Sequence, residues 1–93
     1  MVVLIVERSP ASLRGELSRW MLEIRAGVFV GSLTAAVRER LWLLTCQKLK
    51  GGAGILIFPD RNEQGFSVSM WGDPSRSVVD FEGLRLVEYR SAD

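Results

Sequence analysis

Short apolar runs and longer stretches with apolar residues every three or four positions alternate along this 93-residue chain. The run Val2–Val6 is rich in β-branched residues and stops at a polar cluster, which predicts a central strand covered on both faces. Glu7 stands at the carboxyl end of this strand. Ser9 and Pro10 then predict a helix start, because a serine hydroxyl can cap free N–H groups and proline fits the first helical position.

The first helix is expected to continue to Gly27. Its apolar stripe has helical spacing and consists of Leu13, Leu17, Trp20, Met21 and Ile24. Val28–Val30 predicts a very short strand, and Ser32 is expected to cap a second helix that ends near Leu49. The spacing of the large aromatic residues favours the core over base stacking for Trp20, Trp42 and Phe29.

The second half of the chain reads mainly as strands. Ile55–Phe58 and Gly65–Trp71 predict a hairpin, and Val78–Phe81 and Leu84–Tyr89 are two further strand candidates. This order of elements predicts an α+β fold, a single ferredoxin-like sandwich with two helices on one face of a mainly antiparallel sheet. The extra C-terminal strands could pair with a second subunit or another partner.

Composition narrows the function. A chain this small often gains stability by association, so a homodimer is expected. The chain has no histidine and one cysteine, Cys46, which excludes the usual zinc sites, histidine catalysis and an internal disulfide. The apolar run at the start is too short for a signal peptide or a membrane span, so we expect a cytoplasmic protein without a membrane partner.

Charge is divided unevenly between the two halves. Residues 1–50 hold eight Lys/Arg and four Asp/Glu, whereas residues 51–93 hold four and seven. Ten of the twelve basic residues are arginine, whose planar group pairs well with phosphate. A basic face for nucleic acid and ordinary solvated charge both fit this pattern.

Four motifs carry a family resemblance: LRG (Leu13–Gly15), LEIRAGVFVG (Leu22–Gly31), GF (Gly65 and Phe66) and VDFEGLRLV (Val79–Val87). Because these motifs occur in the family's order and with similar spacing, the chain resembles the small CRISPR adaptation proteins of the type I-E subtype, CRISPR-associated protein two. The resemblance implies a ferredoxin-like homodimer that bridges two dimers of the CRISPR integrase. It also implies a surface along which the double-stranded protospacer lies while the integrase does the chemistry.

The resemblance also indicates contact residues. Arg14 and Arg76 match basic positions of the family and are expected to hold DNA phosphates; Ser12 stands where relatives carry a basic residue and offers only a hydroxyl. Arg38 and Arg40 are either further DNA contacts or exposed helix charges. The expected surface for the integrase consists of Val79, Phe81, Leu84, Leu86, Val87 and Tyr89.

Two other functions stay open. Some family members are metal-dependent nucleases, an activity attributed to an acidic residue after the first strand, and Glu7 occupies that position here. Two Glu7 carboxylates in a dimer could hold Mg²⁺ and activate water, although a structural role for Glu7 is favoured and scaffolding requires no cofactor. Without the motifs, a ligand-sensing or protein-interaction domain would be the default expectation.

Overall fold

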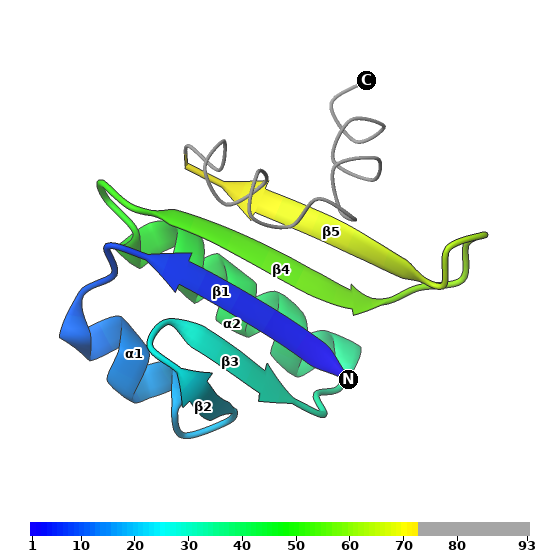
Figure 1. Ribbon diagram of the computed structural model, residues 1–93, viewed down its shortest axis with the longest axis horizontal. Helices are drawn as coiled ribbons and strands as arrows, with labels where there is room; N and C mark the ends of the chain where they lie inside the picture. Colours follow the sequence, from blue (N-terminus) through cyan, green and yellow to red (C-terminus); the bar gives the residue numbers. More distant parts are fainter. Residues whose placement is uncertain (73–93) are drawn as a thin grey trace.

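The computed structural model describes residues 1–72, which form a five-stranded sheet and two helices (Figure 1). In chain order the elements are β1 (Val2–Glu7), α1 (Ala11–Leu17), β2 (Leu22–Arg25), β3 (Val28–Gly31), α2 (Ala35–Lys48), β4 (Ala53–Pro59) and β5 (Phe66–Trp71). The strands predicted at Val78–Phe81 and Leu84–Tyr89 lie outside the described residues.

The strands lie in the order β2-β3-β1-β4-β5, and every neighbouring pair is antiparallel. Each helix connects two strands that have one other strand between them: β3 separates β1 from β2, and β1 separates β3 from β4. This arrangement confirms the predicted α+β fold and is consistent with a ferredoxin-like sandwich, with β5 added at the edge beside β4.

Both helices pack on one face of the sheet (Figure 1). Leu4 of β1 stands opposite Phe29 of β3 and Leu56 of β4 in the register, and all three side chains are buried. Leu13 and Leu17 of α1 are fully buried against this layer. Alternate residues of each strand point to opposite faces, so this apolar layer fixes which residues lie on the other side of the sheet.

That other side, which we call the open face, is also apolar. One row crosses all five strands in register and consists of Leu22, Val30, Val3, Ile57 and Val68. A second row contains Val28, Ile5, Ile55 and Met70. No helix within residues 1–72 covers the open face.

The first helix is shorter than its apolar stripe predicts, and the prediction that it continues to Gly27 is wrong. The Ser18 hydroxyl donates to the Arg14 carbonyl at 2.9 Å, and the next N–H, that of Arg19, bonds the carbonyl three residues back. This tightened turn ends the helix, and residues 22–25 pair with β3 instead. The prediction that Trp20 is in the core is also wrong, since half of it is exposed, whereas the prediction for Phe29 is confirmed.

The second helix begins later than predicted. The Thr34 hydroxyl, not Ser32, caps it by accepting the Val37 N–H at 3.2 Å. Trp42 on this helix is partly buried and packs against the core, close to its predicted position. Neither helix described here is long and apolar enough to cross a membrane.

Candidate nucleic-acid interface

Three connections meet at the end of the sheet where β1 stops: the turns β1–α1, β2–β3 and α2–β4. The Val6 N–H donates to the Gly27 carbonyl at 2.8 Å, which ties the β2–β3 turn to β1. Gly27 has φ +79°, and a Cβ there would strike the Val6 carbonyl. A Cβ on Gly52 would strike the carbonyls of Glu7 and Arg8. The three turns therefore pack backbone against backbone, and glycine is required at both positions.

Arg8 links two of these turns. Its φ of +55° lies in the left-handed region, which costs a residue with a Cβ about 1–2 kcal/mol. Its Nε donates to the Gly51 carbonyl at 3.0 Å, so the side chain of the β1–α1 turn fastens the α2–β4 turn. The remaining guanidinium nitrogens are left at an exposed position.

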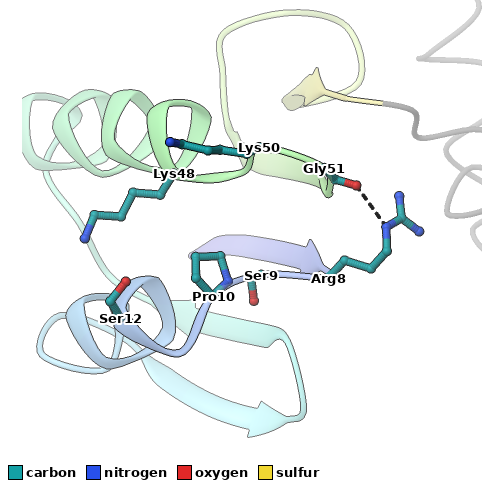
Figure 2. A pocket seen from close by; sticks show the side chains of 7 residues that line it. All are labelled: Arg8, Ser9, Pro10, Ser12, Lys48, Lys50 and Gly51. Atoms are coloured by element: carbon teal, nitrogen blue, oxygen red, sulfur yellow. Dashed lines mark hydrogen bonds between the residues drawn. The ribbon is translucent and has the colours of Figure 1, made fainter.

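Between these two turns lies a hollow of about 480 Å³, which we call the basic groove (Figure 2). It is lined by Arg8, Ser9, Pro10, Ser12, Lys48, Lys50 and Gly51. Lys48 extends from the end of α2 toward Ser12 of α1, and the Arg8 side chain lies on the other side of the hollow, beside Gly51 (Figure 2). Within residues 1–72, no carboxylate lies within 4.0 Å of a side-chain nitrogen of Arg8, Lys48 or Lys50.

Arg14 lies close to the groove but has a protein partner. Its Nη2 is 2.7 Å from Glu23 Oε2 and its Nε is 3.1 Å from the same oxygen, which also accepts the Gly27 N–H at 2.9 Å. The hydrogen bonds from Gly27 and Arg14 lower the pKa of the Glu23 carboxyl. Arg14 therefore joins α1 to the β2–β3 turn, while 42% of its side chain is exposed beside a smaller hollow that Arg8 and Gly27 also line.

The other predicted DNA contacts are spread over the molecule. Ser12 is exposed and lines the basic groove, and Arg40 is exposed on α2. Arg38 lies near the start of α2, at the opposite end of the sheet. Its guanidinium lies 4.0 Å from the centre of the Phe58 ring, and only 17% of its side chain is exposed. Arg76 and the predicted integrase surface (Val79, Phe81, Leu84, Leu86, Val87, Tyr89) lie outside the described residues.

Glu7 does not line the basic groove, although the next residue, Arg8, does. It pairs with Ala53 in the register, and strand alternation places it on the open face together with Val3 and Ile5. The described part of the chain has no group of three or more His, Cys, Asp or Glu residues that could hold a metal ion. Mg²⁺ keeps several waters and is usually bound through one or two carboxylates, so Glu7 offers one ligand and a second copy could add its own carboxylate.

Arg8, Lys48 and Lys50 were not among the contacts predicted from the sequence. Lys48 and Lys50 are the only lysines in the chain, and two cations at a helix end usually indicate an interaction with the helix dipole. The placement of both lysines at one helix end was the sequence feature that could have indicated a basic site there. Only the fold reveals their position, because it brings the end of α2 beside Ser12 of α1.

Arg8→Gly should leave the free energy of unfolding within about 1 kcal/mol of the wild-type value. Glycine relieves the left-handed backbone, and this gain offsets the lost hydrogen bond to Gly51, worth roughly 1 kcal/mol. Urea denaturation measures the difference, with Arg8→Ala as the control. Alanine loses the hydrogen bond and keeps the backbone cost, so equal stability of the two variants would contradict the role given to the backbone.

The Glu23 ion pair should make stability depend on pH in acid. Because folding lowers the pKa of Glu23, its stabilising contribution is complete above its unfolded pKa of about 4.3 and is lost as the pH falls through the lower folded pKa. Glu23→Gln should therefore be less stable than wild type at neutral pH and approach it as the pH falls below the unfolded pKa, in urea denaturation. Glu63→Gln, an exposed loop variant, is the control; a Glu23→Gln deficit that is unchanged in acid would exclude a charge effect.

The geometry thus presents a groove lined by cations, an apolar open face and a single strand-end carboxylate. The comparison with protein families confirms the CRISPR-associated family that the motifs indicate. A family model described as CRISPR-associated protein (Cas_Cas2CT1978) matches residues 1–86, so the chain belongs to this CRISPR-associated family.

Proposed function

We propose that this protein is a homodimeric scaffold of CRISPR adaptation, of the type I-E subtype, acting in the cytoplasm. It bridges integrase dimers and holds double-stranded protospacer DNA by its phosphates, and the integrase does the chemistry. Membership of the CRISPR-associated family supports the general role. The motif LEIRAGVFVG (Leu22–Gly31) supports the subtype.

The observation that carries this proposal is the set of cations around the start of α1. Arg8 and Arg14 line a small hollow of the surface there, and 42% of the Arg14 side chain is exposed. Cations in such positions are suited to phosphate oxygens, and phosphate contacts position a duplex without reading its sequence. Holding DNA in this way needs no catalytic group.

The open face supports the homodimer. Its apolar row crosses every strand, from Leu22 at one edge to Val68 on β5. Val68 is already buried in the single chain, whereas Leu22 is 67% exposed and Val3, Val30 and Ile57 are partly exposed, so a second surface that removes these four from water would stabilise the protein. A second copy presents the same row, so two open faces can pack together about a twofold axis. The C-terminal residues 79–89 remain our proposed surface for the integrase.

A divalent-metal-dependent nuclease is the second candidate, and one observation favours it. Glu7 lies on the open face, so a dimer built through that face would bring two Glu7 carboxylates toward the same interface. Mg²⁺ held between them could activate water for phosphodiester cleavage. Cleavage of nucleic acid by the purified protein with magnesium, abolished by Glu7→Ala, would favour this candidate.

Size-exclusion chromatography with the neighbouring integrase and a labelled duplex tests the scaffold. The proposal expects the dimer, the integrase and the duplex to elute together, and the duplex to be released as salt rises. Arg14→Ala should weaken duplex retention. Separate elution of this protein and the integrase would contradict bridging. Duplex that stays bound at every salt concentration would contradict binding through phosphates.

A further inference from the structure

The basic groove differs from the Arg14 site because, among residues 1–72, its cations have no carboxylate partner. Arg14 is already paired with Glu23 at 2.7 Å, so a phosphate must compete with that carboxylate. Lys48 and Lys50 have no such competitor among residues 1–72. A phosphate can approach them without breaking an existing ion pair.

The groove is also built before any ligand arrives. The Arg8 Nε bond to the Gly51 carbonyl fixes the two turns that form its walls, and Gly52 lets their backbones touch. Lys48 belongs to the last turn of α2, and Lys50 follows two residues later. The positions of the walls are therefore set by secondary structure and by the hydrogen bond from Arg8 to the Gly51 carbonyl.

The arrangement of the cations favours an extended anion. Lys48 extends toward Ser12, and the Arg8 side chain extends away from both beside Gly51, so these charges lie apart and do not converge on one point (Figure 2). The residues that line the groove include no aromatic side chain on which a base could stack. Cations and serine hydroxyls are suited to sugar-phosphate backbone, and a duplex presents its phosphates while its bases stay stacked inside.

We propose that the basic groove is a second phosphate-binding site, in which Lys48, Lys50 and Arg8 hold the backbone of one strand of duplex DNA. This inference rests on the proposed function and adds a site to it: α2 and the turn after it contribute to the DNA surface, as does α1. Ser9 and Ser12 donate hydroxyl hydrogens to phosphate oxygens between the cations.

Fluorescence anisotropy with a labelled duplex across a salt series tests this site. Lys48→Gln and Lys50→Gln should each weaken binding roughly five- to tenfold near 0.1 M salt and reduce the slope of log affinity against log salt by about 0.9. Arg61→Gln is the matched control, because it removes one charge from the loop at the opposite end of the sheet and should change affinity less than about twofold. The double variant Lys48→Arg/Lys50→Arg keeps both charges and should bind like wild type.

Ser12→Glu gives an independent test that leaves both lysines in place. It adds a negative charge at the wall toward which Lys48 points, so it should weaken duplex binding, whereas Ser12→Ala should have a small effect. Thermal unfolding and elution volume establish that each variant is folded and has the wild-type assembly state.

The outcomes of these experiments distinguish failure of this site from failure of the proposed function. Weakened binding by Arg14→Ala together with unchanged affinity and salt slope in Lys48→Gln/Lys50→Gln would overturn the groove alone. Absence of duplex binding by the wild type at low salt would overturn both. Tighter binding of single strands than of duplex, with the same lysine dependence, would overturn the choice of duplex.

Discussion

Phe29→Ala is expected to lower the free energy of unfolding by about 3–5 kcal/mol. Phe29 is fully buried on β3 and stands opposite Leu4 of β1, where the helix layer packs on the sheet. Alanine removes the largest fully buried side chain and leaves a cavity that α1 cannot fill without moving Leu13 and Leu17. Since small domains are stable by only about 5–15 kcal/mol, much of the variant could unfold at physiological temperature.

Urea denaturation followed by circular dichroism measures this loss. Leu43→Ala is the control, because Leu43 on α2 is 55% exposed and its truncation should change stability by less than about 0.5 kcal/mol. A Phe29→Ala loss below about 1 kcal/mol would mean that the helix layer does not pack on β3 as described.

Ile57→Glu is expected to convert the proposed dimer into monomers. Ile57 lies in the middle of the apolar row of the open face, between Val3 and Val68, and is partly exposed in the single chain. The glutamate can stay hydrated in a monomer, but a dimer through this face would bury one unpaired charge from each copy. An uncompensated buried charge costs about 3–5 kcal/mol. The dissociation constant of the variant dimer should therefore exceed the wild-type value by roughly a hundredfold or more.

Analytical ultracentrifugation over a range of concentrations measures the change. Leu43→Glu introduces the same charge on the exposed side of α2 and should leave the dimer intact. A wild-type monomer, or an Ile57→Glu dimer as tight as wild type, would exclude the open face as the dimer interface.

The sequence predicts the layers of this fold well because strands and helices differ in the period of their apolar residues. Between Trp20 and Ile24 this signal is ambiguous, since the apolar residues fit both a helical stripe and a strand. Hydrogen bonding decides between them: Ser18 closes α1, and Glu23 binds Arg14 of α1 and the N–H of Gly27. Such contacts depend on tertiary structure, and a linear pattern does not contain them.

The candidate site was predictable only in part, because some of its contacts also depend on tertiary structure. The resemblance indicated Arg14 and Ser12, and the structure places both near the β1–α1 turn. The sequence could not show that Glu23 pairs with Arg14. Nor could it show that Lys48, far along the chain from Ser12, lines the same hollow. Both facts follow from strand order and from the way the turns pack at one end of the sheet.

Spacer acquisition by cells that carry Glu7→Ala in place of the wild-type chain tests most directly whether the protein acts as a scaffold. Glu7 lies on the open face and does not line the basic groove, so the scaffold account gives its carboxylate no part in holding DNA there. The scaffold account predicts acquisition at the wild-type level, with Arg14→Ala reduced in the same assay. Loss of acquisition by a Glu7→Ala protein that still folds, dimerises and assembles with the integrase would contradict it.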